Sequence, residues 1–251
     1  MMNSTSHQSL DELFAAELYL YFHEDFLSSE RTQRECNFVL EKGQLSTNAR
    51  ILDLACGHGR HANQLAQMGY AVHGIDRDHR FIEIAKAEAV KLGLSTTYEE
   101  QDLLEMEQQN AFDAALLLFN TLGFFNPTDA LRLLQKTQAA LRPGGKLILD
   151  TKNRDHLLQE LIPSTITERD QDLMIDRLSF DTKTGQTLNR RIYIKDGQRY
   201  DTPFAMTTYN FGDLKQMLQR TGFRILDTFG SWRGDAFDNH SRRIILVAEK
   251  L

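Results

Sequence analysis

The 251-residue chain has only two cysteines, Cys36 and Cys56, and only four prolines. Two cysteines are too few for a disulfide framework, and a chain of this length needs none to hold a core, so we expect a cytoplasmic protein. No apolar run reaches the ~20 residues of a membrane-spanning helix, and residues 1–14 lack the basic and apolar regions of a secretory signal. We therefore expect no membrane association.

The sequence also has fewer basic than acidic residues. The sequence has 29 Lys and Arg against 35 Asp and Glu, for a formal net charge of -6. Broad binding to nucleic acid depends on many neutralised phosphates, so we expect no nucleic-acid partner. With 41% hydrophobic and 25% charged residues, the composition is that of an ordinary globular protein. A small molecule is the partner that this composition favours.

From Arg50 onward, short apolar segments alternate with amphipathic ones. The sequence predicts strands over 51–55, 71–75, 96–100, 114–119 and 146–150, and helices over 57–68, 78–92 and 127–141. This alternation is typical of an α/β fold with a doubly wound parallel sheet. The segment 114–119, AALLLF, is continuously apolar, as in a strand that is covered on both faces. Two helical segments precede the first strand, over about 9–22 and 31–42.

The alternation stops after Asp150 and resumes near Asn210. Between them, polar and apolar residues alternate and turn signals occur at Thr184-Gly185 and Asp196-Gly197, which indicates an antiparallel β-meander. A helix over 210–221 and strands over 223–229 and 242–250 follow. We therefore predict one α/β domain made of residues 1–164 and 210–251, with residues 1–45 as a helical cover and residues 165–209 as an inserted β-meander lid.

The segment LDLACGHGRHA, residues 52–62, places Gly57 and Gly59 between a strand and a helix. Glycine permits a tight turn there and lets a ligand approach the backbone, close to the partly positive N-terminus of the helix. Asp76 ends the next strand, 19 residues after Gly57, where doubly wound folds hold a ribose. Together these residues predict a nucleoside site.

Five segments, in this order along the chain, resemble motifs of the class I S-adenosylmethionine-dependent methyltransferases. They are LDLACGHG with its acid Asp53, GIDRD (74–78), Asp102-Leu103, FDAALLLFN (112–120) and LRPGGKLILD (141–150). The resemblance covers residues 50–150 and returns over 210–250. It implies a Rossmann-like, seven-stranded sheet, S-adenosyl-L-methionine as the cofactor, and a methyltransferase of the EC 2.1.1 type.

A further resemblance concerns the acceptor. The helical N-terminus, the CGHGRHA string and Asn153-Arg154-Asp155 resemble a bacterial branch of this family that has an inserted antiparallel sheet. That branch is associated with small-molecule or peptide-type acceptors. The resemblance therefore implies the cofactor and the type of reaction, and does not identify the acceptor. From the acidic composition, we expect transfer of a methyl group to an N or O atom of a small-molecule acceptor.

The resemblance also implies a set of cofactor contacts in this chain. Those expected beside the methionine moiety and its sulfonium are Asp53, Ala55, Gly57, Gly59 and Leu118. Those expected beside the ribose and the adenine are Asp76, Arg77, Asp102 and Leu103. Tyr21 or Tyr19, on the N-terminal helix, would close over the cofactor.

The catalytic residues are less well defined. Asn120, at the end of the 114–119 strand, is a candidate to orient the acceptor, and His240, between the last two strands, is a candidate base. Asn120 lacks the Pro-Pro-aromatic residues that follow it in methyltransferases of nucleic-acid amino groups. Arg154 or Arg233 is a candidate to hold an acceptor carboxylate.

Several alternatives stay open. Cys56, His58 and His61 form a C-x-H-x-x-H string, but a metal needs three or four converging ligands and these residues occupy the cofactor turn, so we expect no metal. The glycine pattern also permits an NAD(P)-linked oxidoreductase, although Tyr193 has Gly197 where a Tyr-x-x-x-Lys pair needs lysine. A non-catalytic S-adenosylmethionine-binding regulator is a third reading, since the fold has no obligatory catalytic side chain. For the meander, the alternative to a lid is a homodimer interface.

Overall fold

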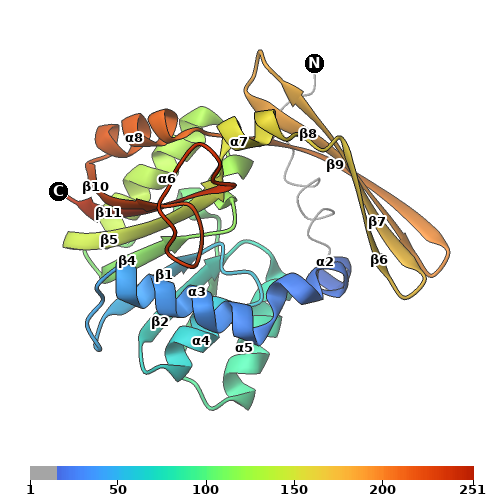
Figure 1. Cartoon of the computed structure of the whole chain (residues 1–251). Coiled ribbons are helices and arrows are strands. Elements are labelled where there is room, and N and C mark those ends of the chain that lie inside the picture. Colours follow the sequence, from blue (N-terminus) through green and yellow to red (C-terminus); the bar gives the residue numbers. More distant parts are fainter. Residues whose placement is uncertain (1–15) are drawn as a thin grey trace.

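A seven-stranded sheet with helices on both faces forms the larger part of the protein, and a second, smaller sheet stands beside it (Figure 1). The computed structural model describes residues 16–251, so the first half of the predicted helix 9–22 lies outside the described residues. The helices are α2 (Ala16–His23), α3 (Ser29–Lys42), α4 (Arg60–Gln67), α5 (His79–Lys91), α6 (Pro127–Ala140), α7 (Arg154–Gln159) and α8 (Phe211–Arg220). Short 3-10 turns are η1 (Glu24–Leu27), η2 (Leu103–Glu105) and η3 (Thr121–Phe124).

The main sheet has the strand order β10-β11-β5-β4-β1-β2-β3. Its strands are β1 (Arg50–Leu54), β2 (Ala71–Asp76), β3 (Thr97–Glu100), β4 (Phe112–Leu117), β5 (Leu141–Lys152), β10 (Phe223–Phe229) and β11 (Arg243–Lys250). All neighbours pair in parallel except β11, which is antiparallel to both β5 and β10. The predicted fold class, a doubly wound seven-stranded α/β sheet with an inserted antiparallel sheet, is confirmed.

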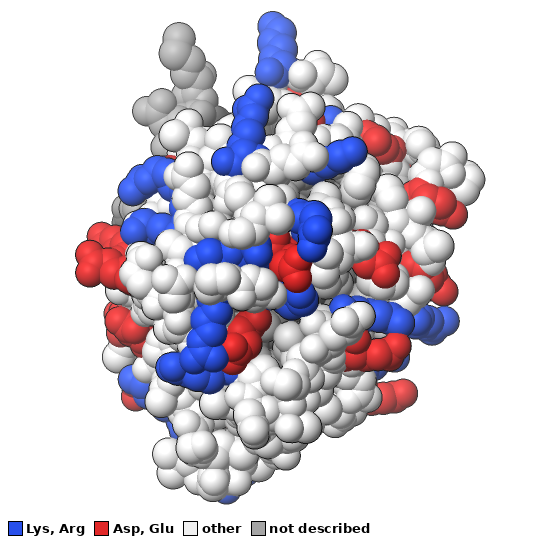
Figure 2. Space-filling model, turned by 90° about the vertical axis from the view of Figure 1, so that its left-hand side faces the viewer, with Lys and Arg blue, Asp and Glu red and all other residues white. Residues whose placement is uncertain are grey.

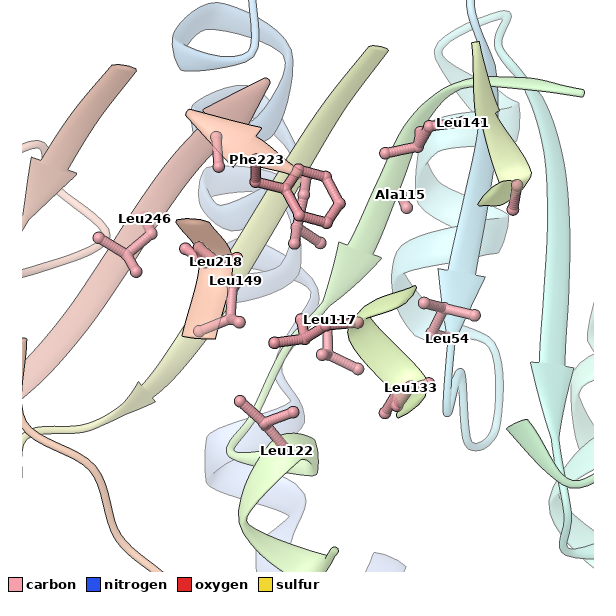
Figure 3. Packing of buried hydrophobic residues seen from close by; sticks show 14 of the residues in the cluster. Leu54, Ala115, Leu117, Leu122, Leu133, Leu141, Leu149, Leu218, Phe223 and Leu246 are labelled. Atoms are coloured by element: carbon pink, nitrogen blue, oxygen red, sulfur yellow. The ribbon is translucent and has the colours of Figure 1, made fainter. Parts of the chain in front are cut away.

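The central strands are covered on both faces, as the apolar run AALLLF predicts. Ala115 and Leu117 of β4 pack on one face with Leu133 of α6 and Leu218 of α8 (Figure 3). On the opposite face, Leu116 packs with side chains of α3 and α4. The two apolar layers fix the carboxyl ends of β1, β2 and β4 at one edge of the sheet.

Some boundaries differ from the prediction because of backbone conformation. Helix α4 begins at Arg60 and not at Gly57, since Gly57 and Gly59 have φ of 54° and 76°, outside the helical region. Strand β4 ends at Leu117 because Phe119 and Asn120 also have positive φ, 55° and 70°. The short helix α7 was absent from the prediction, although Asn153 caps it through a hydrogen bond from the Asp155 amide.

The smaller sheet contains the inserted segment. Its strands β6 (Ser164–Arg169), β7 (Asp172–Asp181), β8 (Gln186–Lys195) and β9 (Gln198–Thr207) follow one another as antiparallel hairpins. Helix α2 lies alongside this sheet in Figure 1, and Phe22 of α2 packs with Met174 and Tyr193. The described part of the N-terminal helix therefore packs against the inserted sheet.

Figure 2 shows Lys and Arg side chains interspersed with Asp and Glu on one face of the molecule. Within residues 16–251, no helix is both long and apolar enough to cross a membrane.

Candidate functional site

A cavity of about 460 Å³ opens at the carboxyl ends of the parallel strands. Ligands in open α/β sheets bind at this edge. The predicted site residues that line the cavity are Asp53, Ala55, Gly57, Asp76, Arg77, Asp102, Leu103 and Leu118. Tyr19 of α2, Gln186 of β8 and Ala205 of β9 also line the wall, so residues far apart in the sequence meet here.

Asp76 connects the ends of the first two strands. Its Oδ2 accepts a hydrogen bond from the Gly57 amide at 2.8 Å, and its Oδ1 accepts one from the Asp78 amide at 2.9 Å. Burial raises the pKa of Asp76, and the two amide hydrogen bonds oppose that effect. The carboxylate is therefore held in a fixed position on the cavity wall, with acceptor capacity left for a ligand.

The two glycines of the turn have different roles. A Cβ on Gly57 would meet nothing within 4 Å, so the space beside this residue is open to the cavity. A Cβ on Gly59 would lie 2.5 Å from Tyr98 Oη and 2.8 Å from the Ala85 side chain. Gly59 is not among the residues that line the cavity, and its lack of a Cβ lets α4 pack closely against its neighbours.

Asp53 lies on β1 and is buried, with no hydrogen-bond partner for Oδ2 among the described residues. Burial raises the pKa of Asp53 to about 7, although the charge of Arg60 and the Ala62 amide act in the opposite direction. An unpaired buried carboxylate is costly. A ligand with a donor or a positive charge would relieve this cost.

At the far side of the cavity, Asp102 and Leu103 follow β3. Asp102 Oδ1 accepts a hydrogen bond from the Leu104 amide at 2.8 Å, which shapes the turn η2. The Leu103 side chain is buried. Both residues face the same cavity as Asp76, as the order of the motifs predicts.

Of the two tyrosines considered as a cover for the cofactor, Tyr19 lines the cavity and Tyr21 does not. The Tyr21 hydroxyl donates to the Arg169 carbonyl at 3.3 Å and to Asp170 Oδ2 at 3.2 Å, at the turn between β6 and β7. Tyr19 lines the cavity and contacts the ring of Phe81 edge-on, with 5.7 Å between the ring centroids. Side chains two residues apart on a helix point in directions that differ by about 200°, so only one of the two tyrosines faces the cavity.

Neither catalytic candidate lines the cavity. Asn120 is buried, and its Oδ1 accepts from Thr151 Oγ1 at 2.7 Å and from the Lys152 amide at 2.8 Å, so it joins the end of β4 to β5. His240 is exposed in the loop before β11. Of the two arginines predicted for a carboxylate, Arg154 pairs with Asp213 at 2.8 Å and Arg233 is exposed outside the cavity wall.

The sequence prediction missed a buried charged cluster beside the glycine turn. Glu35 of α3 accepts from Arg31 at 2.8 Å, and its other oxygen lies 2.7 Å from Arg60 Nη1 and 3.0 Å from His61 Nε2. Burial alone would raise the pKa of Glu35, but the His61 hydrogen bond and the charge of Arg60 lower it to about 2. The i,i+4 pair Arg31–Glu35 was visible in the sequence; the contacts with Arg60 and His61 were not.

Arg60 and His61 also line the cavity. The Arg60 guanidinium lies 4.5 Å from the centroid of the Phe119 ring, and its Nη2 is buried without a partner among the described residues. Burial and the charge of Arg60 lower the pKa of His61 to about 4, and the same causes lower the pKa of His58 to about 4. Both imidazoles are therefore neutral at pH 7. His61 turns to Glu35 while His58 faces the cavity, so the C-x-H-x-x-H string does not converge on one point.

The chain is similar to proteins described as methyltransferases. Residues 51–145 match a family model described as a methyltransferase domain. The chain is similar to a putative methyltransferase of Geobacillus sp. strain WCH70, with 26% identity over 211 residues that cover 80% of this chain and 84% of the relative. It is also similar to the glycine/sarcosine N-methyltransferase of Halorhodospira halochloris, with 26% identity over 88% of this chain and 82% of the relative.

The fold has a close counterpart among solved structures. The crystal structure of an S-adenosylmethionine-dependent methyltransferase from Clostridium acetobutylicum superposes with a TM-score of 0.80 at 18% identity, covering 94% of this chain and 97% of the other. The agreement extends over the inserted sheet as well as the main sheet, since it includes nearly the whole chain.

Proposed function

We propose that this chain is a class I S-adenosylmethionine-dependent methyltransferase and that it transfers the methyl group of that cofactor to an N or O atom of a small-molecule acceptor. One observation supports this most strongly. The family match over residues 51–145 contains Asp53, Asp76 and Asp102, and all three face one cavity at the carboxyl edge of the sheet.

The residues of the cavity fit S-adenosylmethionine, whose methionyl end carries both an ammonium and a carboxylate. Two buried atoms in or beside the cavity wall lack partners, Asp53 Oδ2 and Arg60 Nη2, and they have opposite charge. We infer that Asp53 binds the ammonium and Arg60 the carboxylate. Asp76 would accept from the ribose hydroxyls, and Asp102 and Leu103 would bind the adenine.

Bound S-adenosylmethionine supplies a methyl group on a sulfonium, which is already activated toward displacement. The protein therefore has to orient the acceptor and exclude water. A neutral amine or a carboxylate acceptor needs little acid–base help, whereas an ammonium or a hydroxyl needs a base. His58 and His61 both line the cavity, but burial lowers the pKa of each to about 4, so both are neutral at pH 7 and are weak bases.

We propose that the inserted sheet covers the acceptor side of the cavity. Gln186 of β8 and Ala205 of β9 line the cavity, and Phe124, which also lines it, packs against Phe204 of β9. These contacts favour a lid. A homodimer interface on the outer face of the same sheet is the alternative, and the exposed Ile166 and Tyr200 would then be its apolar contacts.

Two other hypotheses were an oxidoreductase and a non-catalytic regulator. The methyltransferase match assigns the glycine turn to that family, which leaves a nicotinamide-linked oxidoreductase without support. A non-catalytic binding protein would bind the cofactor without turnover. Both cysteines are buried and free, in keeping with a proposed cytoplasmic location.

The test is a radiolabelled methyl-transfer assay, run in parallel on a small-metabolite extract, total RNA and denatured protein. We expect label in the small-metabolite fraction, and we expect Asp76→Ala to reduce it at S-adenosylmethionine concentrations below saturation. Label in RNA at physiological salt would overturn the proposed acceptor class. Cofactor binding without label in any fraction would favour the regulator.

A further inference from the structure

A second group of charged residues lies between the main sheet and the inserted sheet. Lys152 ends β5, and its register partner on β11 is Arg243. Paired residues on neighbouring strands project from the same face of the sheet, with their Cβ atoms about 4.5–5.5 Å apart. Arg191 of β8 faces them from the inserted sheet, and its charge acts on Lys152.

The two arginines already have carboxylate partners. Arg243 binds both oxygens of Asp150, each at 2.5 Å, and Asp150 is completely buried. Arg191 binds both oxygens of Asp176, at 2.7 and 3.0 Å, and Asn189 donates to the same carboxylate at 2.8 Å. These are two-point pairs of the kind that guanidinium groups form with carboxylates.

Lys152 is the exception. It is only partly exposed, and its ammonium has no hydrogen-bond or ion-pair partner among residues 16–251. Burial and the nearby charges of Arg243 and Arg191 lower the pKa of Lys152. A lysine in such a position is costly unless it gains an anion.

This group borders the cavity. Phe119, which lines the cavity, has the Arg243 guanidinium 5.7 Å from its ring centroid, and its amide donates to Asp150 Oδ2 at 3.0 Å. The Lys152 amide also donates to Asn120, the residue after Phe119. Lys152 therefore lies beside the end of β4, on the side away from the ribose-binding Asp76.

We propose that Lys152 binds a carboxylate of the methyl acceptor, with Arg191 and Arg243 reinforcing the positive potential around it. This inference rests on the proposed function and narrows its substrate class to carboxylic acids. The charge count supports a single negative charge. Lys152, Arg191 and Arg243 face Asp150 and Asp176, which leaves one positive charge without a counterpart. A carboxylate supplies one negative charge, whereas a phosphate monoester carries about -1.5 to -2 near pH 7.

Binding of matched ligand pairs tests the proposal without knowledge of the true acceptor. The protein is first saturated with S-adenosylhomocysteine, and then titrated by calorimetry with acetate, propanoate, benzoate and glycine. The controls are the corresponding amides, which have nearly the same shape without the charge, and inorganic phosphate. The variants are Lys152→Met, Lys152→Arg, and Lys215→Met, which removes an exposed lysine on α8.

We expect at least one carboxylate to bind about tenfold more tightly than its amide, a difference that corresponds to one decade in Kd. Lys152→Met should remove this preference, while Lys152→Arg should retain part of it and Lys215→Met all of it. S-adenosylhomocysteine should bind all the variants equally.

Three results would overturn the inference: no carboxylate binds up to its solubility limit, the preference persists in Lys152→Met, or phosphate binds more tightly than every carboxylate. If Lys152→Met does not fold, the comparison of acids with amides in the wild-type protein and in Lys152→Arg still tests whether Lys152 binds a carboxylate. Failure of S-adenosylhomocysteine to bind the wild-type protein would instead count against the proposed function itself.

Discussion

The carboxylate of Asp76 lies 2.8 Å from the amide nitrogen of Gly57, so a hydrogen bond joins the end of β2 to the turn that follows β1. The same carboxylate also caps the residues before α5 through the Asp78 amide. One side chain thus sets the relative position of two strand ends and still borders the cavity. Its replacement should affect ligand binding and local structure together.

For Asp76→Ala we expect weaker binding of S-adenosylmethionine. A hydrogen bond to a charged group contributes about 1.5–3 kcal/mol, which corresponds to roughly a 10- to 100-fold increase in Kd. Calorimetry measures this directly. Asp227→Ala, which removes an exposed carboxylate of β10, should leave Kd unchanged. Equal affinities of the wild-type protein and Asp76→Ala would contradict the assignment of Asp76 to the cofactor.

The Glu35 cluster should matter for stability. Glu35→Gln leaves Arg31 and Arg60 without their buried counter-charge, and removal of one partner from a buried ion pair costs about 3–5 kcal/mol. Urea unfolding should show this as a lower midpoint. Glu88→Gln breaks an exposed pair with Lys91 and serves as the control, with an expected change of about 0–1 kcal/mol. Equal midpoints for the two variants would show that Glu35 contributes no more than a surface pair.

The free energy of unfolding should decrease when the pH is lowered from neutrality, and three histidines cause the first part of this decrease. Burial lowers the pKa of His23, His58 and His61 from 6.5 to about 4 in the folded protein. The unfolded chain therefore binds more protons between pH 6.5 and 4, and stability decreases as the pH falls through this range, by up to about 1.4 kcal/mol per pH unit for each histidine. Glu35, with a pKa lowered to about 2, extends the loss below pH 4.5.

Asp53 acts in the opposite direction. Its raised pKa of about 7 means that the folded protein holds a proton that the unfolded chain releases above about pH 4, so this residue favours folding at lower pH. Asp76, whose pKa burial also raises, acts in the same direction as Asp53, and the three histidines outweigh these two carboxyl groups. Urea midpoints between pH 7 and 4.5 should therefore fall, with a shallower slope in His61→Asn and an unchanged slope in His240→Asn, which alters an exposed loop. A midpoint that rises toward pH 4.5 would be inconsistent with neutral buried histidines.

Ala205→Phe tests whether the inserted sheet covers the acceptor. Ala205 lines the cavity from β9, and a larger side chain would occupy acceptor space while Asp53, Asp76 and Asp102 stay unchanged. Overpacking typically costs about 1–3 kcal/mol, so we expect roughly a 5- to 100-fold loss in kcat/KM with unaltered cofactor affinity. Ser179→Phe, on an exposed position of β7, is the control. A lid role would be wrong if both variants turned over like the wild-type protein.

The sequence predicted the features that depend on local pattern. Continuous apolarity placed β4 in the centre of the sheet, and the offset of Asp76 from Gly57 indicated that they meet at one edge. Features that depend on fine rotation or distant contacts were harder. Tyr19 and Tyr21 lie on one short helix, and the sequence alone does not show which one turns toward the cavity.

Asn120 and Arg60 illustrate the same limit. A strand-end asparagine suggests a functional side chain, yet its positive φ directs it to Thr151 and Lys152, and this conformation is not visible in the residue order. Arg60 meets Glu35 across 25 residues and Phe119 across 59. Such contacts arise only when α3, α4 and the end of β4 are packed together.

The position of β11 between β5 and β10 has a consequence for synthesis on the ribosome. Until residues 243–250 have emerged, β5 presents an unpaired edge and β10 has no neighbour in the sheet. Until then, Asp150 also lacks its ion-pair partner, the guanidinium of Arg243. Exposed strand edges are prone to pairing with other chains. Nascent chains that stall before Arg243 should therefore depend on chaperones more than chains that have passed it.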